Sequence, residues 1–114
     1  MSEGVHENQA MGRVTLTIDL EAGFNEDTVN IYVNRERVAY SEGVTTDYSV
    51  GLAGSVLVDV PPGLITLELS VPKRQISHTL DLEVGQGTSV RASISPQGEL
   101  SINVRPAEQP REYF

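Results

Sequence analysis

The chain has 114 residues, no cysteine, and 16 acidic against 8 basic side chains, which gives a formal net charge of -8 at pH 7. A chain of this length fits a single domain with one hydrophobic core, and the lack of cysteine excludes disulfides, thiolate metal sites and cysteine nucleophiles. The negative charge repels nucleic acid and anionic lipid, and because the basic residues are scattered, we exclude nucleic-acid binding.

Apolar and polar residues alternate along most of the chain, which is typical of half-buried β-strands and not of helices. Val29, Ile31 and Val33, for example, fall on one face of an extended segment, whereas Asn30 and Tyr32 fall on the other. The segments with this pattern are, in chain order, residues 14–20, 29–34, 55–60, 65–71, 76–84, 90–94 and 100–104.

Two further segments, residues 36–40 and 44–50, are short and carry the pattern less clearly. Ser41, Glu42 and Gly43 lie between them and include residue types that favour turns. We therefore expect these two segments to form a hairpin near the edge of a sheet.

Seven or eight short strands, with no segment of helical periodicity, predict an all-β fold built as a two-sheet antiparallel sandwich. A small closed barrel is the alternative, but the uneven early loops and the weak central hairpin favour an open structure. We expect the sandwich domain to span residues 13–104, between a disordered N-terminal arm at residues 1–12 and a mobile C-terminal tail at residues 105–114.

Several turns in the second half of the chain carry a resemblance to a known group of domains. They are Val60-Pro61-Pro62-Gly63, Pro72-Lys73 and Val84-Gly85-Gln86-Gly87, each separated from the next by an alternating strand. Over about residues 55–95 this order resembles the PEGA domains and the wider carboxypeptidase-regulatory-like, transthyretin-like sandwiches. The chain departs from the family at Lys73-Arg74-Gln75, where the family has Gly-Tyr, and its N-terminal half has no clear Pro-Glu-Gly-Ala motif.

The resemblance implies a Greek-key order of strands and a non-catalytic role as an accessory, adhesion, or carbohydrate- or protein-binding module. Fibronectin-type and immunoglobulin-like sandwiches remain alternatives. The lack of tryptophan and cysteine counts against the immunoglobulin-like alternative.

Catalytic machinery is hard to assemble from this sequence, because it has two histidines. His6 lies in the predicted arm, and His78 lies on the apolar face of its strand between Ile76 and Leu80, where a structural role is expected. No nucleophile elbow and no glycine-rich phosphate loop is present. We predict no enzymatic activity and no cofactor, and a small hydrolase using His78 is the remaining enzymatic alternative.

One loop is rich in oxygen ligands. Glu21, Asn25, Glu26 and Asp27 cluster where a sandwich tip is expected, and such loops can bind calcium weakly. The spacing matches no EF-hand, so a solvated acidic loop is the competing interpretation.

Aromatic residues give the best candidates for a binding surface. Tyr32 is predicted to point away from the apolar face of its strand, Tyr40 and Tyr48 belong to the predicted edge hairpin, and Tyr113 and Phe114 end the C-terminal tail. Exposed tyrosines supply contact area at a low entropic cost. The alternative is that each tyrosine packs separately against the sheet and the tyrosines form no common binding surface.

The leading hypothesis is a binding or accessory module that engages a protein or carbohydrate through an edge strand or the tyrosines. The alternative is a structural spacer, or a domain that self-associates into a homodimer by edge pairing. No stretch approaches the roughly 20 apolar residues of a membrane span, and the first ten residues lack a signal-peptide core. The expected location is cytoplasmic by default, or exported if the sequence is excised from a longer protein.

Overall fold

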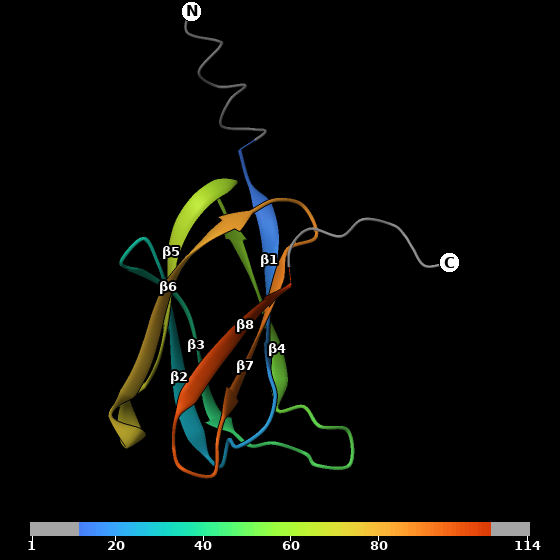
Figure 1. The fold of residues 1–114 in the computed structure, drawn as a ribbon, viewed down its shortest axis with the longest axis vertical. Coiled ribbons are helices and arrows are strands. Elements are labelled where there is room, and N and C mark those ends of the chain that lie inside the picture. The colour runs from blue at the N-terminus through green and yellow to red at the C-terminus, as the bar shows by residue number, and fades with distance from the viewer. Residues whose placement is uncertain (1–11, 106–114) are drawn as a thin grey trace, which may run out of the picture.

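The seven alternating segments and the weaker segment at residues 36–40 become eight β-strands in two sheets, which confirms the expected all-β sandwich (Figure 1). The structure, a computed structural model, describes residues 12–105. Its elements are β1 (Val14–Leu20), β2 (Asp27–Val33), β3 (Glu36–Val44), β4 (Gly54–Val60), β5 (Gly63–Val71), the 3-10 helix η1 (Pro72–Arg74), β6 (Ile76–Val84), β7 (Ser89–Ile94) and β8 (Leu100–Arg105). Within this part of the chain, no helix has the length and apolar character needed to cross a membrane.

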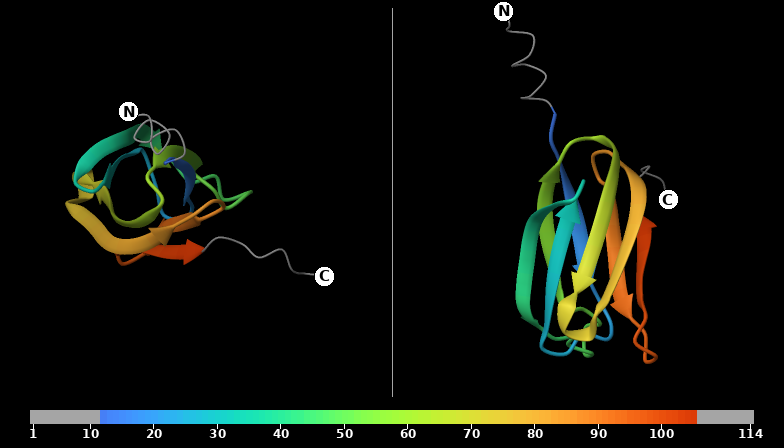
Figure 2. Two further views of the ribbon diagram at one scale, coloured as in Figure 1. Left: turned by 90° about the horizontal axis from the view of Figure 1, so that it is seen from above. Right: turned by 90° about the vertical axis from the view of Figure 1, so that its left-hand side faces the viewer.

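The first sheet has the strand order β4-β1-β7-β8 and the second has the order β3-β2-β5-β6. The views in Figure 2 show the two sheets facing each other. All neighbouring strands are antiparallel except β1 and β7, which run parallel from the pair Thr17–Ser89 to the pair Leu20–Ala92. After β1 the chain forms the β2–β3 hairpin in the second sheet and returns as β4 beside β1, which is a Greek-key connection.

The inner faces of both sheets share one hydrophobic core. Its buried apolar side chains are Leu16, Ile18, Leu20, Phe24, Val29, Ile31, Val33, Val44, Val58, Val60, Ile65, Leu67, Leu69, Val71, Leu82, Val84, Val90, Ala92, Ile94 and Leu100. Ile76, Leu80 and Ile102 pack against this core but stay partly exposed, because they lie on the edge strands β6 and β8. The prediction that alternate residues meet in a shared interior is therefore confirmed.

The predicted hairpin between residues 36–40 and 44–50 is wrong. β3 continues as one strand through Glu42 and Gly43, and residues 45–53 form the connection to β4. Asp27 pairs with Val44 whereas Val29 pairs with Ser41, so β3 holds one extra residue at this point. Gly43 has a φ of 66° and lets β3 bulge without reversing its direction.

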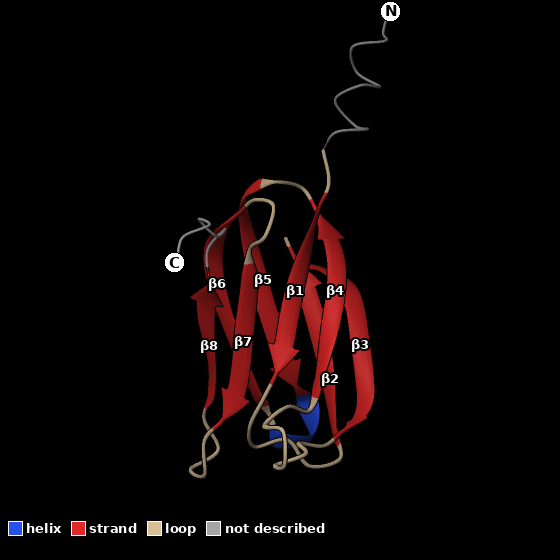
Figure 3. Cartoon of the chain, turned by 90° about the vertical axis from the view of Figure 1, so that its right-hand side faces the viewer, coloured by secondary structure: helices blue, strands red, loops and turns tan. Residues whose placement is uncertain are grey.

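Four connections meet at one end of the sandwich, which we call the loop end (Figure 3). They are residues 21–26 between β1 and β2, residues 45–53 between β3 and β4, the helix η1 between β5 and β6, and residues 95–99 between β7 and β8. Most side-chain hydrogen bonds between distant parts of the described chain lie here, so this end is the place where the fold builds a defined polar site.

Candidate functional site

Gly23 is at the centre of the loop end. Its φ is 93°, and a Cβ atom at this position would lie 2.0 Å from the carbonyl oxygen of Ile94, so only glycine fits. The Gly23 N–H donates to the hydroxyl of Tyr48 at 3.0 Å, and its carbonyl accepts from Nη2 of Arg74 at 3.0 Å. One residue thus joins the β1–β2 loop to two other segments.

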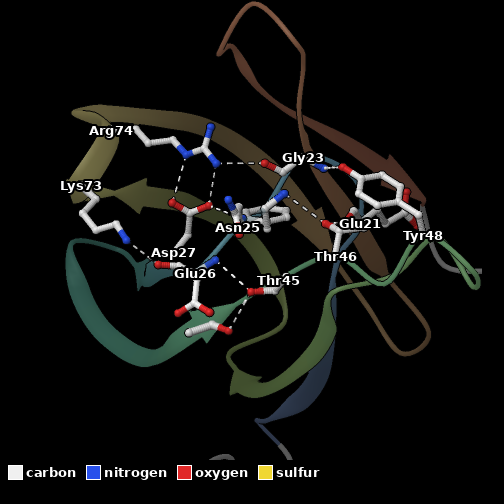
Figure 4. Close-up of polar contacts among 12 residues, drawn as sticks. Glu21, Gly23, Asn25, Glu26, Asp27, Thr45, Thr46, Tyr48, Lys73 and Arg74 are labelled. Atoms are coloured by element: carbon white, nitrogen blue, oxygen red, sulfur yellow. Dashed lines mark hydrogen bonds and ion pairs between the residues drawn. The ribbon is translucent and has the colours of Figure 1, made fainter.

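An ion pair between a carboxylate and a guanidinium holds the end of the β1–β2 loop where β2 begins (Figure 4). Asp27 begins β2 on its inward face and is only 1% exposed, while the Arg74 side chain on η1 is 32% exposed. Arg74 donates from Nε to Oδ1 of Asp27 at 3.0 Å and from Nη2 to Oδ2 at 2.8 Å. This two-pronged geometry is the strong form of the pair, and it ties η1 to the start of β2.

The charges at this pair stabilise one another. Burial raises the pKa of the Asp27 carboxyl, but the hydrogen bonds from Arg74 and from the Asn25 backbone outweigh burial, with help from the charges of Arg74 and Lys73. The pKa of Asp27 therefore lies below the usual value for an aspartate. The hydrogen bond to Asp27 in turn raises the pKa of Arg74, so both groups are ionised at neutral pH.

Threonine hydroxyls hold the same loop from the β3–β4 connection. Oγ1 of Thr46 accepts from the Phe24 N–H at 3.0 Å and donates to the Glu21 carbonyl at 2.5 Å. Oγ1 of Thr45 accepts from the Glu26 N–H at 2.9 Å. Phe24 is buried in the core beneath these contacts, so the loop is anchored by apolar packing as well as by hydrogen bonds.

A pocket of about 430 Å³ opens beside Gly23. Its lining residues are Ala22, Gly23, Tyr48, Arg74, Ile94, Ser95 and Pro96. Tyr48 is 71% exposed, and its ring stands at the wall of the pocket with the hydroxyl fixed by Gly23. Nη1 of Arg74 makes no hydrogen bond to any residue between 12 and 105, so it is free to donate to a ligand.

The lining is rich in hydrogen-bond donors, although the Tyr48 and Ser95 hydroxyls also accept from backbone N–H groups. Tyr48, Arg74 and Ser95 supply O–H and N–H donors, and none of the lining residues is a carboxylate or a histidine. The arrangement can therefore bind oxygen acceptors next to a flat aromatic face.

The four residues predicted to bind calcium do lie on one loop, but they do not converge on a metal position. Asp27 is engaged by Arg74, and the Glu26 carbonyl accepts from the Lys73 ammonium at 2.5 Å. The described part of the chain contains no group of three or more His, Asp or Glu side chains placed to hold a metal ion. Calcium binding at Glu21, Asn25, Glu26 and Asp27 stays a prediction.

The tyrosines predicted to form a binding surface lie in two places. Tyr48 belongs to the pocket, whereas Tyr32 and Tyr40 lie on the outer face of the second sheet. Arg37 lies opposite Tyr32 in the pairing of β2 with β3, and its guanidinium carbon lies 5.0 Å from the centre of the Tyr40 ring. Tyr113 and Phe114 fall outside the described residues.

His78 lies where the alternation places it, on the inward side of β6 between Ile76 and Leu80 and opposite Leu69 of β5. It is half-buried, and its side chain makes no hydrogen bond to another residue of the described range. The other histidine, His6, precedes that range.

Sequence reasoning missed the role of Arg74 and, with it, the pocket. One signal was present, because Asp27 lies on the same face of β2 as the inward-facing Val29 and Ile31. An aspartate on a buried face needs a hydrogen-bond donor or a positive charge as its partner. The sequence does not say which of the seven arginines is that partner, because Arg74 is 47 residues away.

Known proteins add no function to this geometry. No model of a known protein family matches the chain, and no curated protein matches it either.

Proposed function

We propose that this domain is a non-catalytic binding module that engages a protein or carbohydrate partner at the loop-end pocket. The observation that carries the proposal is the presence, in one pocket, of an exposed tyrosine ring and of a guanidinium nitrogen, Nη1 of Arg74, that makes no hydrogen bond within residues 12–105. Both groups are held in place before any ligand arrives, Tyr48 by Gly23 and Arg74 by Asp27. Such preorganisation lowers the entropic cost of binding.

The size and lining of the pocket favour a segment of a larger partner. Ligand sites in proteins commonly measure about 300–1,000 Å³ and combine apolar walls with a few fixed polar groups. The exposed ring of Tyr48 offers a stacking surface for a flat or apolar group. Nη1 of Arg74 and the hydroxyl of Ser95 offer hydrogen bonds to carbonyl or sugar oxygens beside it.

Electrostatics favour a neutral ligand over an anionic one. Asp27 already neutralises Arg74, so the pocket presents donors without an uncompensated positive charge. The net charge of -8 also repels anions at long range. The favoured ligand is therefore uncharged and rich in oxygen acceptors, as peptide backbones and neutral sugars are.

The absence of catalysis is part of the proposal. His78, the candidate base of a small hydrolase, lies between apolar neighbours on β6, whereas the pocket is at the loop end. The resemblance to the PEGA and transthyretin-like sandwiches implies the same kind of non-catalytic role. Membership in that group of domains is part of the proposal.

Two probes test this function: a random peptide library displayed on phage, and an array of neutral oligosaccharides. Each is applied to the wild-type chain and to two variants, Tyr48→Ala and Tyr40→Ala. Both tyrosines are exposed, but only Tyr48 lines the pocket, so Tyr40→Ala is the matched control.

We expect ligands from one of the two libraries to lose about tenfold or more in affinity with Tyr48→Ala, as an aromatic anchor in an interface does, and to bind Tyr40→Ala as they bind wild type. Ligands that bind all three proteins equally, or that depend on Tyr40 alone, would contradict the proposal. So would the absence of any specific ligand from both libraries.

A further inference from the structure

The four edge strands of the sandwich differ in how they are protected against pairing with another chain. Natural edge strands are usually guarded by charges, bulges or proline. β3 has two irregularities in its pairing with β2 and carries Glu36, Arg37 and Glu42. β6 presents Asp81 and Glu83 on its outer face, so both edges of the second sheet are guarded.

In the first sheet, the edges β8 and β4 differ from each other. The outward residues of β8 are Ser101, Asn103 and Arg105, all of them polar. β4 pairs with β1 in one unbroken register over its seven residues. Its single charge is Asp59, and the centre of its outer face is Leu57, which is 64% exposed.

Exposed large apolar side chains are more frequent on β3, β4 and the connection between them than in the rest of the described chain. The large apolar residues that the described structure leaves exposed on β3, β4 and the connection between them are Val38, Tyr40, Tyr48, Val50, Leu52 and Leu57. Elsewhere in residues 12–105 only Leu64 and Val104 are of this kind. β3 and β4 also contact each other, and Figure 3 shows them next to one another along one side of the sandwich. These side chains lie on different faces, since Tyr40 is on the outer face of the second sheet and Tyr48 is at the loop end. The exposed apolar side chain that β4 itself offers to a pairing strand is Leu57.

We propose that two copies of the chain pair antiparallel through β4, with Leu57 on the two-fold axis. In this register Leu57 lies opposite Leu57 of the second copy, Val56 lies opposite Val58, and Ser55 lies opposite Asp59. The two first sheets join into one continuous sheet of eight strands in the order β8-β7-β1-β4-β4-β1-β7-β8. The occupant of the edge is thus a second copy of this chain.

The sequence of β4 is complementary to itself in this register. A shift by one residue would turn the inward faces of one copy outward, and a shift of the axis from Leu57 to Asp59 would set two carboxylates opposite each other, which is unfavourable. With Leu57 on the axis, all seven residues pair and no two carboxylates of β4 lie opposite each other. Ser55 and Asp59, which lie opposite each other, keep their hydrogen bonds to Asp19 and Thr15 of their own chains. Pro61 directly follows β4 and lacks the N–H needed to extend the pairing.

Such a pairing closes on itself. Because β4 of each copy is used once, a two-fold dimer leaves no free β4 edge, and assembly stops at two chains. Leu57 and the partly buried Val56 would lose their exposure to water, which supplies an apolar driving force in addition to the new backbone hydrogen bonds.

Sedimentation equilibrium of the full chain, from micromolar to millimolar concentration, tests the dimer. We expect the apparent mass to rise to twice that of the monomer in the wild type and in Leu64→Lys, and to stay monomeric in Leu57→Lys. The last variant sets two ammonium groups against each other on the axis. Leu64 is the matched control, because it is 71% exposed and lies on the outer face of β5, which is an inner strand of the second sheet and not an edge.

A wild-type chain that is monomeric at every concentration would overturn the proposal. A dimer that survives Leu57→Lys would do the same, as would species that keep growing beyond two chains.

The register is tested by disulfide trapping in a glutathione buffer, since the chain has no cysteine of its own. Leu57→Cys is expected to cross-link to itself, and a mixture of Ser55→Cys with Asp59→Cys is expected to form a mixed dimer. Leu64→Cys is expected to remain uncross-linked. Equal cross-linking of Leu57→Cys and Leu64→Cys would overturn the register. Tyr48 lies outside β4, so the Tyr48→Ala variant is expected to dimerise like wild type, and failure of one proposal does not imply failure of the other.

Discussion

Gly23 shows how a single residue controls the candidate site. Its positive φ and its close approach to Ile94 are backbone constraints, whereas its contacts with Tyr48 and Arg74 are made by its own N–H and C=O. A displacement of Gly23 would therefore shift two walls of the pocket together. The pocket depends on glycine at this position for steric reasons and for the direction in which its peptide groups point.

A pair of glycine substitutions separates steric clash from backbone strain. Gly23 and Gly98 have nearly the same φ, 93° and 89°, but a Cβ atom at Gly98 meets nothing within 4 Å. We expect Gly98→Ala to lower the free energy of unfolding by about 1–2 kcal/mol through strain alone. Gly23→Ala should cost at least about 3 kcal/mol, because the clash with the Ile94 carbonyl is added. Urea unfolding measures both, and equal losses would show that the clash is absent.

The Asp27–Arg74 pair makes a prediction about pH. The pKa of Asp27 is depressed in the folded protein relative to about 3.9 in an unfolded chain. Between these two pKa values the unfolded state binds more protons than the folded state, so the free energy of unfolding rises with pH in this range. The stabilisation that Asp27 contributes is lost as the pH falls through the folded pKa. The stabilisation is fully present above about pH 5.

Asp27→Asn is expected to flatten this acid-side slope, measured by urea unfolding at a series of pH values. The comparison variant is Asp47→Asn, which replaces the exposed Asp47 carboxylate, whose pKa is also lowered by hydrogen bonds from Ser49, with a neutral amide. A smaller flattening is expected there, because the partner is a hydroxyl and a backbone amide and not a guanidinium. Equal slopes in wild type and Asp27→Asn would contradict the account of this pair.

At the scale of the elements, the β2–β3 hairpin shows a local conflict between sequence and backbone. Asn34 and Arg35 form its turn with φ values of 51° and 73°. Asparagine tolerates this region and here also accepts from the Thr66 N–H through its side chain at 3.0 Å. Arginine does not favour a positive φ, and two-residue hairpin turns of this kind prefer Asn-Gly.

Arg35→Gly is therefore expected to stabilise the protein by about 0.5–1 kcal/mol, since it relieves the strain of a positive φ at a cost in unfolded-state entropy. Glu36→Gly, one position later and at the start of β3, should be destabilising by about the same amount. Thermal unfolding followed by circular dichroism measures both changes. Destabilisation by Arg35→Gly would mean that the turn does not adopt the positive φ values.

The elements that could be predicted from the sequence are those set by local alternation. Segments such as 65–71 and 76–84 reappear almost unchanged as β5 and β6. β3 was misjudged because Gly43 can serve a turn or a bulge equally well, and only its pairing with β2 decides between them. The pocket could not be predicted, because it depends on the contact of Arg74 with Asp27 across 47 residues.

At the scale of the whole molecule, the proposed pocket and the proposed dimer edge are distinct surfaces joined by one segment. The β3–β4 connection contributes Tyr48 to the pocket and leads directly into β4. A dimer paired through β4 would therefore carry two pockets in a fixed relation to each other. Two linked sites raise the apparent affinity for a repetitive partner without any new contact, which suits a module that binds extended chains.

The most direct test of the proposed function is a nuclear magnetic resonance titration of isotope-labelled chain with a peptide or neutral oligosaccharide selected from the two libraries. The largest shifts are expected at the Gly23 amide and at the Nε–H of Arg74, with smaller ones at Ser95, because these groups surround the pocket. Shifts centred on the Tyr32 and Tyr40 face of the second sheet, with Gly23 and Arg74 unmoved, would contradict the assignment of the loop end as the binding site.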